Sequence, residues 1–169
     1  MNLFKILLLL LFTVPLYGQR AKIYAVHDGD SYKVLIEGKT EKQWIRIQGI
    51  DCPEVRSNII TKTQPYGRIV ADSVRLMLKG KTVTIDSMYT DIYNRMIAKV
   101  YLDTTDVAKV IVSKGWAFVD VNNKGYEKYY NELEKLKLIA EKNKTGIWFS
   151  GEVVHPITWR SIYRNGKSL

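Results

Sequence analysis

The sequence contains very few of the residues that cross-link a chain or bind zinc. Its 169 residues include one cysteine, Cys52, and two histidines, His27 and His155. A single cysteine excludes a disulfide within the chain, so packing and any bound ion must stabilise the folded domain. Zinc sites are built mainly from cysteine and histidine, and the small supply of both argues against a structural or catalytic zinc site.

The chain also lacks an apolar run long enough to predict a transmembrane helix, which needs about 20 residues. The run at residues 6–12 is shorter, follows Lys5, and is ended by Pro15 and Gly18. A positive residue, a short apolar run and a small residue near its end are typical of a signal peptide. We therefore predict a signal peptide over residues 1–18, cleaved near Gly18-Gln19, and a secreted or periplasmic protein. An uncleaved membrane anchor is the alternative.

Acidic residues are the minority among the charged side chains. Lysine and arginine number 26 against 17 aspartate and glutamate residues, a formal net charge of +9. Loss of Lys5 with the signal peptide would leave +8. This excess favours a polyanionic partner such as nucleic acid, although a general contribution to solubility remains the alternative.

Alternating apolar and polar residues predict five short strands. The turn Asp28-Gly29-Asp30 separates the first two, and the third ends before Asp51-Cys52-Pro53, because proline cannot donate to a strand ladder. The predicted strands are residues 21–27, 31–37, 42–50, 82–86 and 95–102.

Three helices are predicted, at residues 65–79, 106–114 and 126–143. Pro65 stands in the first turn of the first helix, and Gly80 and Gly115 end the first two. Five strands with one helix after the third and two after the fifth indicate a β-barrel with helices (α+β). The five-stranded oligonucleotide-binding (OB-fold) barrel is the candidate fold. We expect one domain over residues 19–150.

A basic tail follows over residues 151–169, and it is predicted to be irregular. Its aromatic and basic side chains could stack on bases or pack on the barrel. The favoured prediction packs Trp159 on the barrel and leaves Arg160, Tyr163 and Arg164 in solvent.

Carboxylates and arginines recur at the ends of the predicted strands. Asp28 and Asp30 lie in a turn, and Asp51 and Glu54 follow the third strand; each pair alone is ordinary. Two acidic strand ends that converge at one rim of a barrel repel each other unless a cation holds them together. Oxygen ligands of this kind suit Ca²⁺ or Mg²⁺.

Two arginines accompany these carboxylates. Arg46 lies on the polar face of the third strand, and Arg95 opens the fifth. A guanidinium group matches two phosphate oxygens at once, so arginines beside a metal site suit phosphodiester chemistry. The alternative for Arg46 is a salt bridge to Asp30 or Glu54. Cys52 is predicted to be a small buried residue, because no histidine near it in sequence would activate a thiolate.

The order and spacing of several motifs together resemble the thermonuclease (staphylococcal nuclease-like) family. The resemblance covers residues 21–148, nearly the whole domain that would follow the signal peptide. The motifs are Asp28-Gly29-Asp30, residues 44–54, Pro65-Tyr66-Gly67, Tyr93-Asn94-Arg95, Gly115-Trp116-Ala117, residues 145–148 and residues 156–160 of the tail.

The resemblance implies an OB-fold barrel with three helices and a Ca²⁺-dependent phosphodiesterase. By analogy, Asp30, Asp51 and the backbone carbonyl of Cys52 bind calcium, and Asp28 acts on the ion through water. Glu54 would orient or deprotonate the attacking water. Arg46 and Arg95 would hold the scissile phosphate, and Tyr93 would pack against the nucleotide. The analogy also implies cleavage of the 5′-O–P bond, which leaves 3′-phosphate ends.

The sequence departs from the family pattern at three places. Cys52 replaces a common threonine, and Arg68 stands where an acidic residue is frequent. The stretch Val119-Asp120-Val121 lacks the tyrosines that line a base pocket, for which Phe118 or Tyr126 could substitute.

The sequence therefore predicts a secreted, monomeric Ca²⁺-dependent nuclease that acts on single-stranded or frayed DNA and RNA with little sequence specificity. Whether Mg²⁺ or Mn²⁺ can replace Ca²⁺ stays open. The alternative is a non-catalytic OB-fold module that binds single-stranded nucleic acid.

Overall fold

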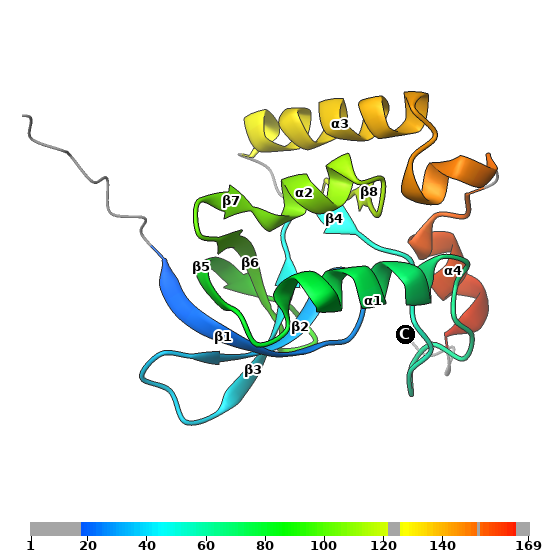
Figure 1. Ribbon diagram of the computed structural model, residues 1–169. Coiled ribbons are helices and arrows are strands. Elements are labelled where there is room, and N and C mark those ends of the chain that lie inside the picture. Colours follow the sequence, from blue (N-terminus) through cyan, green and yellow to red (C-terminus); the bar gives the residue numbers. More distant parts are fainter. Residues whose placement is uncertain (1–17, 122–125, 152, 165–169) are drawn as a thin grey trace, which may run out of the picture.

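The computed structural model describes residues 18–121, 126–151 and 153–164 (Figure 1). The predicted signal peptide lies outside these residues, apart from Gly18. In the described part of the chain, no helix has the length and apolar character needed to cross a membrane.

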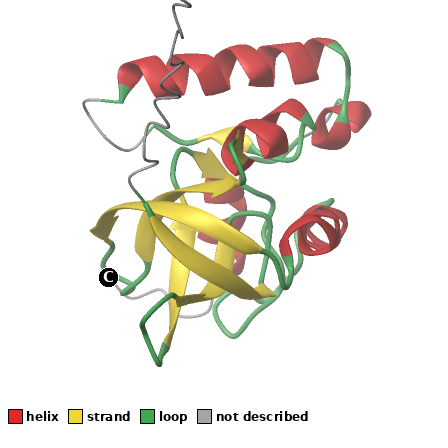
Figure 2. Cartoon of the chain, turned by 60° about the vertical axis from the view of Figure 1, so that its left-hand side comes forward, coloured by secondary structure: helices red, strands yellow, loops and turns green. Residues whose placement is uncertain are grey.

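The five main strands form a closed barrel. Antiparallel pairs join β3 to β2, β2 to β1, β1 to β5 and β5 to β6, and a parallel pairing of β3 with β6 closes the cylinder. Figure 2 shows these strands crossing one another around the barrel, as the OB fold requires. The strands are β1 Gln19–Val26, β2 Ser31–Ile36, β3 Lys42–Ile47, β5 Thr82–Thr90 and β6 Met96–Leu102.

Three two-residue strands complete the sheets. β7 (Thr105–Asp106) extends the barrel sheet beside β6. β4 (Ile50–Asp51) pairs with β8 (Phe118–Val119), with Asp51 opposite Phe118. This small second sheet fixes Asp51 directly after the end of β3.

Within the described residues the chain forms four α-helices, which leave the outer side of β1, β2 and β3 uncovered (Figure 1). They are α1 Gly67–Leu78, α2 Val107–Ser113, α3 Glu127–Lys142 and α4 Pro156–Tyr163, and a 3₁₀ helix, η1, spans Gly146–Ser150. The carboxylate of Asp106 caps α2 by accepting from the N–H groups of Ala108 and Lys109. Both views place α2 between the barrel and the long helix α3 (Figures 1 and 2).

Alternating burial along the strands explains why these sequences form the barrel. Ile23, Tyr32, Val34, Ile45 and Ile85 point into the core and are fully buried, while their neighbours in sequence face outward. α1 covers the barrel with the apolar stripe of Val70, Val74 and Leu78, and α3 adds Tyr129, Tyr130, Leu133 and Ala140.

The predicted fold is confirmed, but several boundaries differ. β5 continues to Thr90, and β3 stops at Ile47 rather than at Ile50. α1 begins at Gly67, because Tyr66 adopts a left-handed conformation at its N-cap.

The tail is the main error in the predicted elements. It contains the helix α4, with Pro156 in its first turn and the His155 ring accepting from Ile157 N–H. The structure therefore has four α-helices among the described residues in place of the three predicted. The prediction of an irregular tail is therefore wrong. A helix of eight residues is too short to be stable by itself and depends on tertiary packing, which the local sequence does not reveal.

Candidate active site

The side chain of Asp28 holds together the turn between β1 and β2. Its Oδ1 accepts from the backbone N–H groups of Asp30 (3.1 Å) and Ser31 (2.8 Å). Gly29 is required at the centre of the turn because a side chain there would collide with Cys52 and Val70. Asp28 therefore sets the position of Asp30, a structural role beside the one that the sequence predicts.

Arg46 brings two buried carboxylates together. It extends from the outer face of β3, with Nη1 2.9 Å from Asp30 Oδ1 and Nη2 2.7 Å from Asp51 Oδ1. Because neighbouring nitrogens of one guanidinium contact both oxygens, the two carboxylates lie side by side. The alternative prediction, a salt bridge from Arg46 to Asp30 or Glu54, is confirmed for Asp30. The second partner of Arg46 is Asp51 and not Glu54.

The backbone at Cys52 completes the surroundings of Asp30. The Cys52 N–H donates to Asp30 Oδ2 at 2.8 Å, and the Ser31 hydroxyl donates to Oδ1 at 2.9 Å. The Cys52 side chain is buried, as predicted, and burial raises the pKa of its thiol well above the ordinary value. The thiol is therefore a packing group, and the peptide of Cys52 is the part that meets the carboxylates.

A second arginine enters the cluster, and it comes from the tail. Arg160 of α4 donates through Nη1 and Nη2 to the two oxygens of Asp51, at 2.9 and 2.8 Å, and through Nη1 to Glu54 Oε1 at 2.6 Å.

The prediction of solvent exposure is wrong for Arg160 and for Tyr163, which is half-buried with its ring 4.4 Å from that of Trp159, and it is right for Arg164. Trp159 is buried, as predicted. In the sequence, Arg160 directly follows Trp159 and comes four residues after Pro156. A proline that can start a helix and an aromatic residue that can pack were the local signs that this segment would be ordered.

Hydrogen bonds to the loop before α1 fix α4 in place. Trp159 Nε1 donates to the carbonyl of Lys62 at 2.8 Å, and the N–H of Thr61 donates to the carbonyl of Tyr163 at 2.8 Å. The buried amide of Gln64 links the Glu54 backbone to the Val154 carbonyl. These contacts fix the position of α4 and so place the Arg160 side chain beside Asp51 and Glu54.

The cluster carries more acidic than basic groups. Asp120, after β8, joins it with Oδ2 3.9 Å from Arg46 Nη2, a position that no local sequence signal marks. Five carboxyl groups then face the guanidinium groups of Arg46 and Arg160; they are Asp28, Asp30, Asp51, Glu54 and Asp120.

The pKa shifts reflect this imbalance. Burial, and then the charge of Asp30, raise the pKa of Asp28 well above its ordinary value. Burial also raises the pKa of Glu54, partly opposed by the hydrogen bond from Arg160. For Asp51, burial is outweighed by Arg160 and Arg46, so its pKa falls below the ordinary value. Asp51 is thus the carboxylate that the arginines keep ionised.

Arg95 and Tyr93 lie in the turn between β5 and β6. Arg95 pairs with Asp91 of the same turn, with Nε and Nη2 2.9 and 2.8 Å from Oδ2. The Tyr93 ring is exposed and lies 5.4 Å from the Arg95 guanidinium carbon and 5.9 Å from that of Arg164. Met96 pairs with Ile45, so Arg95 starts beside the strand that carries Arg46.

The donor chemistry of the cluster fits a hard cation, although its oxygen atoms are already engaged. Within the described residues, no group of three or more His, Cys, Asp or Glu is arranged to hold a metal ion. Arg46 and Arg160 donate to both oxygens of Asp51 and to Oδ1 of Asp30, and the Cys52 N–H donates to Asp30 Oδ2. The excess of buried carboxylates still favours a cation, because added positive charge would relieve their repulsion.

The two suggested substitutes for the missing tyrosines have different surroundings. The ring of Phe118 packs against those of Trp148 and His155, with centroid distances of 4.9 and 4.4 Å. Tyr126 is exposed and lies 5.2 Å from Lys99 Nζ. Of the two, Tyr126 has the ring that faces solvent.

The closed five-stranded barrel, with acidic and arginine side chains gathered at one rim, places the protein in the class of OB-fold barrels. Residues 44–150 match the family model for staphylococcal nuclease homologues. The chain belongs to the staphylococcal nuclease family, which confirms the resemblance seen in the sequence.

The relatives include bacterial and plant proteins. An uncharacterized endonuclease of Escherichia coli O157:H7 is 34% identical over 142 residues, covering 82% of this chain and 83% of that protein. An uncharacterized endonuclease of Haemophilus influenzae is 26% identical over 161 residues, covering 90% and 82%. A staphylococcal-like nuclease of Arabidopsis thaliana is 29% identical over 124 residues, which are 72% of this chain but 34% of the plant protein.

Proposed function

We propose that the protein is a Ca²⁺-dependent nuclease that hydrolyses phosphodiester bonds of single-stranded or frayed DNA and RNA. Family membership and relatives named endonuclease support the nuclease activity. The observation that carries the proposal is the placement of Arg46 between Asp30 and Asp51, with Glu54 joined to the same cluster through Arg160.

The metal site that we propose uses the carboxylates of Asp30 and Asp51 and the backbone carbonyl of Cys52. Asp28, which positions Asp30 in the turn, would act on the ion through water. When bound, a calcium ion would polarise a phosphate oxygen and offset the negative charge of the diester. Mg²⁺ and Mn²⁺ are the two ions to compare with Ca²⁺.

Glu54 is the carboxylate that we assign to the attacking water. One of its oxygens accepts from Arg160, so the group is held in a fixed orientation at the rim. Its raised pKa makes it a better proton acceptor than an ordinary glutamate. Attack of water on phosphorus, with proton transfer to Glu54, would break the P–O5′ bond. The leaving 5′ oxygen would take up a proton from solvent, so that the products are a 3′-phosphate and a 5′-hydroxyl.

The arginines would bind the phosphate. Arg46 is held at the rim by two carboxylates, and Arg95 starts from the neighbouring strand. Donors fixed before the reaction stabilise the developing negative charge without a cost of reorganisation. The exposed ring of Tyr93 is available to a nucleotide on the same side as Arg95.

The cellular setting belongs to the proposal as well. The apolar N-terminal run with Lys5 supports a secreted or periplasmic protein, and the excess of basic residues supports a polyanionic substrate. We propose that the protein acts as a monomer.

Cleavage of heat-denatured DNA and of RNA, followed as acid-soluble nucleotides, tests the proposal. We expect release with Ca²⁺ and none with a chelator, and parallel assays with Mg²⁺ and Mn²⁺ define the metal requirement. Retardation of DNA without release in any metal would identify a non-catalytic binding module.

Glu54→Gln tests the assignment of the base. The variant keeps the shape of the side chain and should lose at least about two orders of magnitude in turnover, with unchanged thermal unfolding. Glu134→Gln changes a carboxylate on α3 that is 42% exposed and serves as the control. Turnover by Glu54→Gln near that of the unaltered protein would remove Glu54 from the mechanism.

A further inference from the structure

The outer face of β1, β2 and β3 carries exposed rings and lysines that the carboxylate cluster does not use. Tyr24 of β1 is 40% exposed and Trp44 of β3 is 39% exposed, far more than rings that fill a core. We name this surface the basic-aromatic face; its residues are Lys22, Tyr24, Lys33, Lys42 and Trp44.

The strand register arranges these side chains in rows. Trp44 pairs with Lys33, and one row further along, Lys42 pairs with Leu35, which in turn pairs with Lys22. Ile23 and Val34, which lie between them in sequence on β1 and β2, are buried, and Gln43 between Lys42 and Trp44 is half-buried. The lysines and rings therefore form one continuous surface across three strands, because alternate residues of a strand share a face.

Positive charge lies against each ring. Lys33 Nζ is 5.7 Å from the centroid of Trp44, and Lys42 Nζ is 4.1 Å from that of Tyr24. An exposed contact of this kind is worth about 0.5–1 kcal/mol. Stacking of a base on an aromatic ring is worth about 1–3 kcal/mol, so a base can displace the lysine from the ring toward a phosphate.

This face is continuous with the candidate active site. Trp44 and Arg46 are alternate residues of β3 on the same face, about 6.5 Å apart along the strand. Arg46 contacts the carboxylates at the rim, and Lys33 lies two residues beyond Ser31, the residue that pairs with Arg46. A strand of nucleic acid with a phosphate at Arg46 would next meet the Trp44–Lys33 row.

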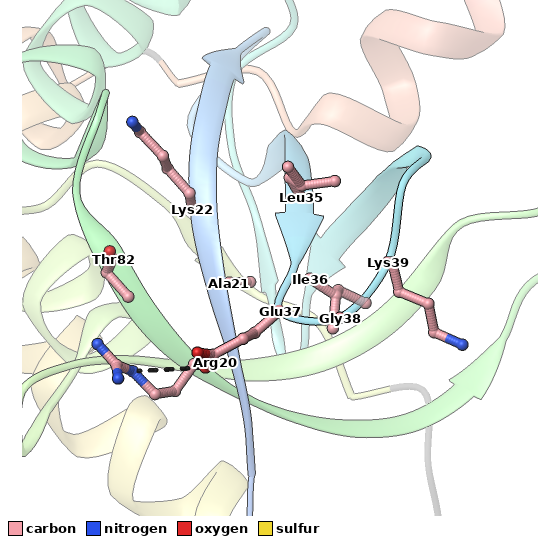
Figure 3. Close-up of a pocket in the computed structure, with 9 residues that line it drawn as sticks. All are labelled: Arg20, Ala21, Lys22, Leu35, Ile36, Glu37, Gly38, Lys39 and Thr82. Atoms are coloured by element: carbon pink, nitrogen blue, oxygen red, sulfur yellow. Dashed lines mark ion pairs between the residues drawn. The ribbon is translucent and has the colours of Figure 1, made fainter.

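The far end of the face is a shallow hollow between β1, β2 and the first residue of β5 (Figure 3). Lys22 and Lys39 line it, together with the exposed ion pair of Arg20 and Glu37. Two acidic residues lie near this end of β2 and β3: Glu37, which lines the hollow and pairs with Arg20, and Glu41, which directly precedes β3. The balance of charge along the face suits a polyanion.

We propose that the basic-aromatic face binds the part of a single-stranded polynucleotide that extends beyond the cleaved bond. One base stacks on Trp44, and Lys33 and Lys42 contact phosphates. The inference rests on the proposed function, because it takes the scissile phosphate to lie at Arg46. It assigns the affinity for long substrates to the β1–β3 face rather than to the rim alone.

The test compares substrates of different length. Trp44→Ala should raise the KM for a single-stranded DNA of about 12 nucleotides by about 10-fold and leave kcat and the cleavage of a dinucleotide unchanged. Lys33→Ala should lower the slope of log affinity against log salt by about 0.7, the value for one lost phosphate contact on a single strand. Lys135→Glu on α3, a charge change on a helix remote from β1–β3, is the control.

Binding measured in chelator separates this inference from the proposed chemistry. Trp44→Ala should weaken binding of the normal oligonucleotide and leave binding of an abasic oligonucleotide of equal length unchanged, since only the former has bases to stack. Equal losses for both, or an equal KM change for the dinucleotide, would overturn the role of Trp44. If the unaltered protein binds but never cleaves, the proposed function fails and the face can still be judged by binding.

Discussion

The two arginines that the sequence assigns to the phosphate occupy different environments. The Arg46 side chain is 15% exposed and is held by the fully buried Asp51 and the nearly buried Asp30. The Arg95 side chain is 27% exposed and pairs within its own turn, with Asp91. Arg46 belongs to the packed rim of the barrel, whereas Arg95 belongs to a surface turn.

This difference separates the stability of the fold from its chemistry. Removing one partner from a buried ion pair leaves an uncompensated charge, while an exposed pair contributes little. We therefore expect substitutions around Arg46 to affect folding and turnover together, and substitutions around Arg95 to affect turnover alone.

Arg46→Ala should have the largest effect. We expect the free energy of unfolding without metal to fall by about 3–5 kcal/mol, because Asp30 and Asp51 lose their shared partner. Turnover should fall by about 10³–10⁵-fold, as for arginines that stabilise a phosphoryl transition state. Urea unfolding and cleavage assays measure the two effects. Arg75→Ala is the control; it removes an ion pair to Asp72 and a hydrogen bond to the Val26 carbonyl, and it should cost less than about 2 kcal/mol.

Arg95→Ala should keep the stability of the fold and lose activity. The free energy of unfolding should change by less than about 1 kcal/mol, and turnover should fall by about 10²–10³-fold. Arg164→Ala removes the other arginine beside Tyr93 and is the matched control. A loss of stability as large as that of Arg46→Ala would contradict the contrast between the two regions.

Arg160→Ala should have an intermediate effect. Glu54 and one oxygen of Asp51 lose a charged partner, which we expect to cost about 1.5–3 kcal/mol of stability. Loss of a group that orients active-site carboxylates should lower kcat by about 10–100-fold with KM unchanged. Arg160→Lys should recover little, because an ammonium group cannot bind both carboxylates with the planar fork of arginine. Full activity of Arg160→Lys would show that charge alone is needed.

Asp91→Asn should have the smallest effect. The amide oxygen of the new side chain could still accept from the backbone N–H groups of Tyr93 and Arg95, so only the charge pairing with Arg95 is lost. We expect turnover to fall by about 1.5–5-fold, the size of an exposed ion pair. A loss equal to that of Arg95→Ala would mean that Asp91 fixes the active position of Arg95.

The pH dependence of this turn follows from the same contacts. Burial is outweighed by hydrogen bonds from Arg95, so the pKa of Asp91 lies below its ordinary value. The contribution of Asp91 to stability is therefore complete above the ordinary aspartate pKa and is lost as pH falls through the lowered value. Chemical shifts of the Tyr93 and Arg95 amides, followed through acid titration, measure this loss.

Local patterns in the sequence predicted most of the fold. Alternation of Ile23, Ile45 and Ile85 with polar neighbours marked the strands, and Gly80 and Gly115 marked helix ends. The short pairing of β4 with β8 was not predicted, because two residues carry no periodicity. The helix α4 was missed because its stability comes from the contact of Trp159 with the loop at Lys62.

Only part of the candidate site could be predicted from the sequence. The types and order of Asp30, Arg46, Asp51 and Glu54 identified a cluster that the structure brings together. Arg160 and Asp120 come from segments remote in sequence, and their contacts depend on packing that no local pattern reports.

Residue types and their spacing along the chain were enough to predict the barrel strands, the acidic and basic residues at the rim, and the family. Those features are local, since each depends on residue type and on spacing along the chain. The tertiary structure decided that Arg46 is shared by two buried carboxylates, that Arg160 of the tail joins them, and that Arg95 pairs in its own turn. Burial and the partners of a charge are set by segments that meet only in the folded protein, and they determine what each charge contributes.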